Sequence, residues 1–334
     1  MNLEQLKKLI PSDYKKHASR DLCIFTTSVF GETYTKSFKE LFGFEFPNIF
    51  WAVRKGNYMT FYRSEREHQY MRRKLGEKVA SDKYSKFVIK RLTELTDWFN
   101  EFMKNNQTLE LFNKHKQEFV DNYREFFAFH QIVYWGGDYM LENMPELKEI
   151  IKGLQKVYAY NEKVVPDAEK YLAELGIDHL TYRQTEDIDF EEVGFLFRTD
   201  DNTIIIKGDK LDDFENYIIN LQKVSDDVKE FQGIAVSKGN VKGPIQIISN
   251  PHKLHKAKEG HIIVTGMTRP QFNHILSKTL GIITEEGNIL CHAAILSRET
   301  GLPVVTGVKH STEIFQDGDY VELDADSGVV RRIM

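Results

Sequence analysis

The chain has little of what marks secreted, membrane or nucleic-acid-binding proteins. Only two cysteines, Cys23 and Cys291, occur among its 334 residues, which excludes a disulfide scaffold and fits a reducing compartment. No apolar run is long enough to cross a membrane, and the first residues lack the apolar core of a signal peptide. A net charge of −5 gives no general attraction to nucleic acid. These absences predict a cytoplasmic globular protein that binds neither membrane nor nucleic acid.

Aromatic side chains are abundant instead, with 23 Phe and 15 Tyr, and most of them precede residue 200. Apolar residues recur there at helical spacing, and Ser81 is a suitable N-cap. Phe87 is expected on the inner face of the helix that Ser81 begins. Two short hairpins are expected at 50–62 and 195–207. The longer helices are predicted over 20–42, 81–105 and 109–143.

After residue 230 the sequence changes to short β-rich segments separated by glycines. This change predicts two domains, a mainly helical one over 1–230 and a second over 231–334. The strands of the second domain are expected at 241–248, 261–264, 281–284, 320–323 and 329–333.

One histidine stands where an imidazole can carry a negatively charged group. His292 lies at the predicted start of a short apolar helix, behind a loop that begins at Gly287. The N–H groups of a first helical turn are unpaired and carry partial positive charge, so phosphoryl oxygens would find donors there. Neutral imidazole is also nucleophilic near pH 7.

The last hundred residues resemble the phosphohistidine swivelling (mobile) domain of the phosphoenolpyruvate-utilising enzymes, and most closely the phosphoenolpyruvate synthase branch. The resemblance rests on four segments in the family's order: 233–243 (GIAVSKGNVKG), 264–270 (VTGMTRP), 291–303 (CHAAILSRETGLP) and 317–321 (DGDYV). It implies an α + α/β chain, in which a mainly helical N-terminal domain precedes a β/β/α phosphohistidine swivelling domain.

The resemblance also implies roles for particular residues. His292 would carry the phosphoryl group, with Cys291 and Arg298 acting beside it. Arg298 either reaches phosphate oxygens or braces the loop through a nearby carboxylate, and Cys291 either transfers a proton or simply packs. The loop around the phosphoryl group would comprise Thr284, Gly287 and Asn288.

In the family, an ATP-grasp domain charges the histidine, and no nucleotide-binding pattern is recognisable in this sequence. We therefore expect a phosphohistidine-carrier component of a pyruvate, water dikinase-like phosphotransferase. Its partner would be an ATP-grasp-type subunit that binds ATP and Mg²⁺, its acceptor would be a small molecule, and the chain itself would hold no cofactor.

A second interpretation stays open. Asn288 and Leu290 stand where the family usually has glycine and threonine. This difference favours a non-catalytic binding or regulatory protein that keeps the swivelling domain as a scaffold.

The densest aromatic segment, residues 126–139, holds a candidate acceptor pocket. His130 and Asp138 would place a base near Trp135, although a core helix with a glycine kink explains the same pattern. Glu65 and His68 form a single Glu-x-x-His turn, which we interpret as surface charge because a di-metal site needs two such turns. No metal site is expected.

Overall fold

The computed structural model forms two compact units, Met1–Tyr217 and Ile218–Met334. The chain is helical in its N-terminal part and rich in strands in its C-terminal part. No helix in the described part of the chain is long and apolar enough to cross a membrane. The structure describes residues 1–46, 49–54, 58–183, 193–198, 203–221, 229–248, 251–268, 270–286, 293, 297 and 300–333.

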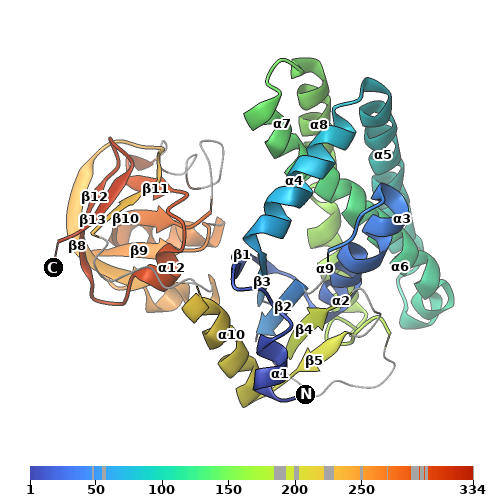
Figure 1. The fold of residues 1–334 in the computed structure, drawn as a ribbon, viewed down its shortest axis with the longest axis horizontal. Coiled ribbons are helices and arrows are strands. Elements are labelled where there is room, and N and C mark those ends of the chain that lie inside the picture. The colour runs from blue at the N-terminus through green and yellow to red at the C-terminus, as the bar shows by residue number, and fades with distance from the viewer. Residues whose placement is uncertain are drawn as a thin grey trace. The chain divides into compact units, whose positions relative to one another are not determined.

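A five-stranded antiparallel sheet organises the N-terminal unit (Figure 1). Its strand order is β1-β3-β2-β4-β5, so the two predicted hairpins, β2–β3 and β4–β5, are confirmed and share one sheet. The strands are β1 (Tyr14–Asp21), β2 (Ile49–Arg54), β3 (Tyr58–Ser64), β4 (Val193–Phe197) and β5 (Ile204–Ile206).

Two groups of helices flank this sheet. Phe50 and Tyr62 point to one face, where they meet Phe214 and Glu215 of α10. Trp51 and Phe61, on the opposite face, belong to a large aromatic core to which α2 to α9 contribute. The helices up to residue 221 are α1 (Leu3–Lys7), α2 (Ile24–Glu32), α3 (Phe38–Phe42), α4 (Glu65–Val79), α5 (Asp82–Asn105), α6 (Leu109–Gln131), α7 (Gly137–Asn143), α8 (Lys148–Asn161), α9 (Val164–Glu174) and α10 (Asp209–Leu221).

Two π-helical segments interrupt the long helical runs. η1 (Thr33–Ser37) joins α2 to α3, and η2 (Ile132–Gly136) joins α6 to α7. The predicted helix over 109–143 is therefore confirmed as a continuous helical run, with one π-helical turn that the sequence pattern does not reveal.

Three expectations for this unit are wrong. The helix expected from residue 20 begins at Ile24, because the chain as far as Asp21 pairs with β3. Phe87 is 51% exposed, since the buried face of α5 runs through Ser85, Val88 and Leu92 instead. His68 is 6% exposed and packs against the Trp135 ring, so it is not surface charge.

The C-terminal unit is built on an eight-stranded sheet of order β6-β13-β12-β8-β9-β10-β11-β7. Strands β8 to β11 run parallel, and the pairs at either end are antiparallel. The strands are β6 (Glu230–Gln232), β7 (Ile234–Ala235), β8 (Asn240–Ile247), β9 (His261–Thr265), β10 (Thr279–Thr284), β11 (Val304–Thr306), β12 (Tyr320–Asp324) and β13 (Val329–Arg332).

The parallel strands are buried on both faces. Ile262 and Ile283 belong to one apolar cluster, and Ile263 and Ile282 belong to another on the opposite face. The second cluster lies against the 3₁₀ segments, where Phe272 is fully buried. The helical elements of this unit are η3 (Pro251–Lys256), η4 (Pro270–Lys278) and α12 (Ser311–Ile314). All five strands predicted for this region are confirmed, whereas the short β6, β7 and β11 were not anticipated.

Candidate functional site

The carboxyl ends of the parallel strands meet at one edge of the C-terminal sheet. Thr265, Thr284 and Thr306 are the last residues of β9, β10 and β11, and all three are buried. In sheets of this kind, ligands bind outside the carboxyl ends of parallel strands. This edge is therefore the natural place for a functional loop.

The end of β10 is fixed from several sides. The backbone N–H of Glu285 donates to Thr265 O at 3.0 Å, and that of Glu286 donates to Gly266 O at 2.9 Å. The Thr284 hydroxyl donates to Glu286 O at 2.6 Å. Glu285 accepts a hydrogen bond from the Thr312 hydroxyl at 2.7 Å. The chain that continues past Glu286 therefore starts from a rigid support.

Three described residues follow the loop in the sequence. Ala293, Ser297 and Thr300 are helical, and the first two are buried at 2% and 1% exposure. Positions four apart share a helix face, so this face packs on the sheet. The Ser297 hydroxyl donates to Val236 O at 3.4 Å, and Gly301, at φ 71°, donates its N–H to Ser297 O. A glycine in this conformation is a usual helix end.

Of the predicted phosphoryl-site residues, Gly287, Asn288, Cys291 and His292 lie between Glu286 and Ala293 in the sequence, whereas Thr284 ends β10 and Arg298 follows Ser297. Thr284 lies in the described part of the chain, where its hydroxyl holds the backbone of Glu286. The other predicted members lie outside the described residues: Gly287, Asn288, Cys291, His292 and Arg298.

Sequence reasoning missed two hydroxyl groups near this edge. Thr306 at the end of β11 and Ser311 at the start of α12 are fully buried. Neither hydroxyl oxygen has a hydrogen-bond partner among the described residues. Their residue types are common in every protein, so the sequence carried no signal for them.

The candidate acceptor residues of the N-terminal unit do not form one cluster. His130 Nδ1 lies 3.0 Å from Asn161 Oδ1, and desolvation by burial lowers the pKa of His130 to about 4. Asp138 has its pKa raised by burial, with Arg72 opposing the shift. Although both residues are described, no hydrogen bond or ion pair joins His130 to Asp138. Trp135 instead packs against His68, with ring centroids 4.5 Å apart.

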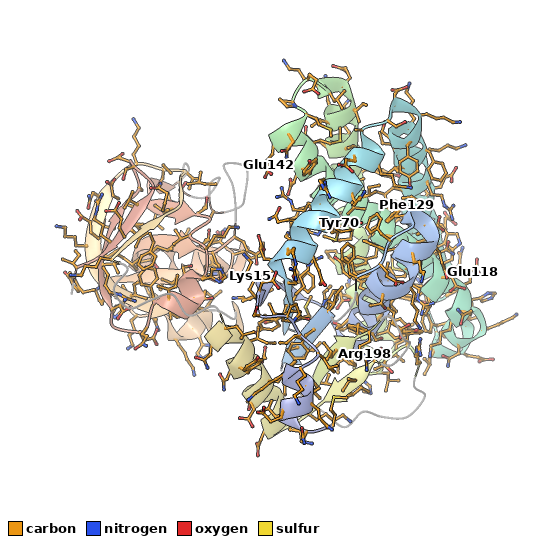
Figure 2. All side chains as sticks on the ribbon, in the orientation of Figure 1. Lys15, Tyr70, Glu118, Phe129, Glu142 and Arg198 are labelled. Carbon is orange, nitrogen blue, oxygen red and sulfur yellow. The ribbon has the colours of Figure 1, made fainter. Side chains whose placement is uncertain are left out.

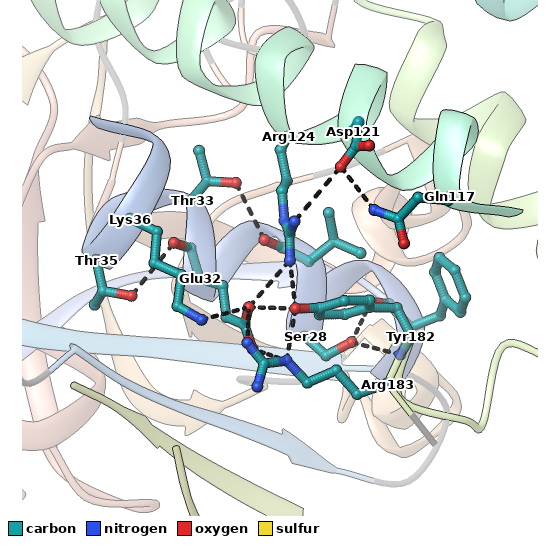
Figure 3. Close-up of polar contacts among 12 residues, drawn as sticks. Ser28, Glu32, Thr33, Thr35, Lys36, Gln117, Asp121, Arg124, Tyr182 and Arg183 are labelled. Atoms are coloured by element: carbon teal, nitrogen blue, oxygen red, sulfur yellow. Dashed lines mark hydrogen bonds and ion pairs between the residues drawn. The ribbon is translucent and has the colours of Figure 1, made fainter. Parts of the chain in front are cut away.

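A charged network surrounds a buried carboxylate in the same unit (Figure 3). Glu32 of α2 is 3% exposed and pairs with Arg124 at 3.1 Å, Arg183 at 2.8 Å and Lys36 at 3.5 Å. The hydroxyl of Tyr182 also donates to Glu32. Because three cations converge on one carboxylate, this network ties α2 and α6 to the chain at residues 182–183.

One protein family and several known proteins share sequence with parts of this chain. The family described as PEP-utilising enzyme, mobile domain, matches residues 257–328. A probable phosphoenolpyruvate synthase of Archaeoglobus fulgidus is 32% identical over 180 residues, which cover 51% of this chain and 23% of that protein. One from Methanothermobacter thermautotrophicus is 40% identical over 99 residues, covering 30% and 14%. An uncharacterised phosphotransferase of Bacillus subtilis is 39% identical over 98 residues, covering 29% and 12%.

The chain thus spans less than a quarter of the length of these relatives. The Archaeoglobus match is longer than the C-terminal unit, so the similarity extends beyond that unit.

Among solved structures, a solution structure of Enzyme I matches 95% of this chain and 84% of its own at 15% identity, with a TM-score of 0.26. A Thermococcus kodakaraensis aconitase X chain matches 32% of this chain at 18% identity, with the same TM-score. Scores this low support no structural assignment.

Proposed function

Since residues 257–328 belong to the mobile-domain family of the phosphoenolpyruvate-utilising enzymes, we propose that the C-terminal unit is a β/β/α phosphohistidine swivelling domain. His292 is its phosphoryl carrier. The observation that supports this most directly is the position of His292 in the chain, between the anchored end of β10 and the buried helical residue Ala293.

The proposed chemistry is a double displacement at phosphorus. The neutral His292 imidazole attacks the phosphoryl group of the donor, so an N–P bond forms while the bond to the donor oxygen breaks. A nucleophilic oxygen of the acceptor then attacks phosphorus, and the imidazole leaves. Arg298 would stabilise the phosphoryl oxygens, and Cys291 would assist proton transfer.

The surrounding loop has a different role in this proposal. Gly287 and Asn288 would supply backbone N–H groups to the phosphoryl oxygens. The Thr284 hydroxyl is engaged with Glu286 O, so Thr284 is a positioning residue for the loop.

The donor and the acceptor complete the proposal. An ATP-grasp-type component with ATP and Mg²⁺ would charge His292, and a small molecule would receive the phosphoryl group. Probable phosphoenolpyruvate synthases are among the similar proteins, which supports a phosphotransferase of that kind. The aromatic-rich N-terminal unit would bind the acceptor, with His130, Trp135 and Asp138 as candidates for contact.

A non-catalytic binding or regulatory protein is the second candidate. Its support is sequence alone, because Asn288 and Leu290 replace residues that the family uses around the histidine.

Complementation of a deletion strain separates the two functions. His292→Ala is compared with His274→Ala, which alters an exposed histidine of the same unit. The carrier function predicts that His292→Ala fails to restore the phenotype of the parental strain, whereas His274→Ala restores that phenotype fully. Full restoration by His292→Ala, at equal protein abundance, would favour the scaffold function.

A further inference from the structure

Arg63 is a buried cation, and two nitrogens on one edge of its guanidinium make no hydrogen bond within the described part of the chain. It lies near the end of β3 and is 1% exposed. Its Nη1 donates to Met71 Sδ at 3.1 Å. Among the residues that the structure describes, Nε and Nη2 have no hydrogen-bond partner. These two nitrogens form the edge with which a guanidinium binds two oxygens of a carboxylate or phosphate side by side.

Aromatic rings hold the guanidinium in place. Its central carbon lies 4.2 Å from the Phe61 ring centroid, 5.1 Å from that of Tyr34 and 6.0 Å from that of Trp135. Cation–π attraction stabilises such a group. Of the three rings only Tyr34 carries an oxygen, and its hydroxyl interacts with the guanidinium while Nε and Nη2 remain without a hydrogen bond of normal geometry. Burial accordingly lowers the pKa of Arg63, and the Tyr34 hydroxyl opposes this shift.

Two further buried nitrogens near Arg63 lack partners in the described part of the chain. They are Nε1 of Trp51 and Nδ1 of His68. Trp51 pairs with Phe61 in the sheet, so it shares the face of the sheet that carries Arg63. His68 packs on Trp135, the same ring that borders Arg63. Burial, reinforced by Arg63, holds the pKa of His68 well below its usual value, so this imidazole is neutral.

Each of the two π-helical segments contributes one of the aromatic rings that border Arg63. Tyr34 belongs to η1, and Trp135 belongs to η2. Gly136, next to Trp135, lies against the backbone of α4, where an added Cβ would meet Leu75 C at 3.0 Å. π-helical turns occur frequently at functional sites because they reposition side chains at some cost in helix regularity.

A series of side-chain contacts leads from His68 to the partly exposed Glu65. The Glu65 carboxylate, 36% exposed, lies 2.9 Å from Lys15 Nζ and 3.7 Å from His17 Nε2. The His17 ring in turn lies 4.3 Å from the His68 ring. Figure 2 labels Lys15, which lies on β1, an outer strand of the five-stranded sheet.

We propose that Arg63 binds the oxyanion group, a carboxylate or a phosphate, of a small molecule in the N-terminal unit. Nε and Nη2 donate to two of its oxygens, and the Trp51 indole and the His68 imidazole supply further donors. A guanidinium buried without an anion is strongly unfavourable, and an oxyanion ligand removes that penalty. The proposal uses only residues of the N-terminal unit, so it stands or falls separately from phosphorylation of His292.

Anion titrations of the whole chain test this site. The probes are inorganic phosphate and benzoate, each titrated at constant ionic strength against chloride. Tryptophan fluorescence is the readout, because Trp135 borders Arg63 and Trp51 packs on Phe61, whose ring also borders Arg63. We expect a saturable change with at least one anion, and the responding anion identifies the phosphate or the carboxylate class.

Three variants make the test specific. Arg63→Met should abolish the saturable change. Arg63→Lys keeps the charge but not the two-nitrogen edge, and should weaken binding about tenfold or more. Arg91→Met, which removes a partly exposed partner of Glu125, should bind as the natural chain does. No saturation with either anion, or equal binding by the Arg63→Lys and natural chains, would overturn the proposal.

Discussion

Two carboxyl groups in the N-terminal unit, one buried and one half-buried, illustrate how environment, more than residue type, decides what a side chain does. Glu32 is surrounded by three cations, whereas Glu67 on α4 lies near Asp13 with no cation in ion-pair contact among the described residues. Nothing in the sequence distinguishes these two glutamates, because the difference arises mainly from Arg124, Arg183 and Asp13, each more than fifty positions from the glutamate that it affects.

Removal of the Glu32 charge should destabilise the N-terminal unit strongly. Glu32→Gln leaves Arg124, Arg183 and Lys36 without their shared carboxylate; these cations are 21%, 48% and 27% exposed, so water replaces part of the interaction and the expected loss is about 1.5–3 kcal/mol. Denaturant unfolding followed by tryptophan fluorescence measures this, since all three tryptophans lie in that unit. Glu94→Gln, at an exposed ion pair, should change stability by less than about 1 kcal/mol. Equal effects of the two substitutions would contradict the role given to Glu32.

Glu67 should make stability depend on pH. Burial, and secondarily the Asp13 carboxylate, raises the pKa of Glu67 to about 7 from an ordinary value of 4.5. Between these values the folded chain holds a proton that the unfolded chain has released, so stability falls as pH rises through this window. Glu67→Gln removes this dependence, and its stability relative to the natural chain should rise from about pH 4.5 to 7 and then level off.

The matched control for this dependence lies on the same helix. Glu77→Gln alters a side chain that is 44% exposed, and its difference from the natural chain should stay constant across the window. A flat difference for Glu67→Gln as well would mean that Glu67 has an ordinary pKa.

At the scale of elements, the sequence predicted best those segments whose ends and periodicity are local. Ser81 caps α5, whose N–H at Tyr84 donates to the serine hydroxyl, and the helix ends at the predicted Asn105. The strands of the C-terminal unit were predicted from apolar runs between glycines. Local chemistry determines these elements, so one stretch of sequence suffices to find them.

The elements that were missed depend on distant partners. β1 has the polar sequence YKKHASRD, with no alternation of apolar residues, and becomes a strand because it pairs with β3. A register shift between Lys16 and Ala18 further hides its pattern. The π-helical turns likewise leave no periodic signal, since each changes the helix period for only five residues.

Two adjacent glycines test the close packing of α4 on η2. A Cβ at Gly136 would meet Leu75 C and O and Gly76 N at 3.0–3.2 Å, whereas one at Gly137 meets nothing within 4 Å. Gly136→Ala should therefore cost about 1–3 kcal/mol through overpacking. Gly137→Ala should gain about 0.5–1 kcal/mol, because alanine loses less backbone entropy in a helix. Chemical denaturation of both variants measures the contrast, and a stabilising Gly136→Ala would show that α4 and η2 are not packed this tightly.

At the scale of the whole molecule, the sequence predicted the C-terminal part far better than the N-terminal part. Spaced motifs around His292 identified the mobile-domain family, and residues 257–328 match it. For the N-terminal unit the sequence predicts helices and two hairpins, but the joining of both hairpins and β1 in one sheet, and the burial of Arg63, depend on contacts that no short motif encodes. Its candidate pocket residues are neighbours in sequence, and in the structure His130 lies beside Asn161 while Trp135 packs on His68 near Arg63.

The central claim is that His292 carries a phosphoryl group, and peptide mapping by mass spectrometry tests it most directly. The chain is incubated with labelled ATP in an extract of its native cells and kept alkaline, because phosphohistidine survives base and is lost in acid. The natural chain and the His274→Ala control should carry one acid-labile phosphoryl group on His292, and His292→Ala should carry none. An unlabelled natural chain, or label retained by His292→Ala, would contradict the claim.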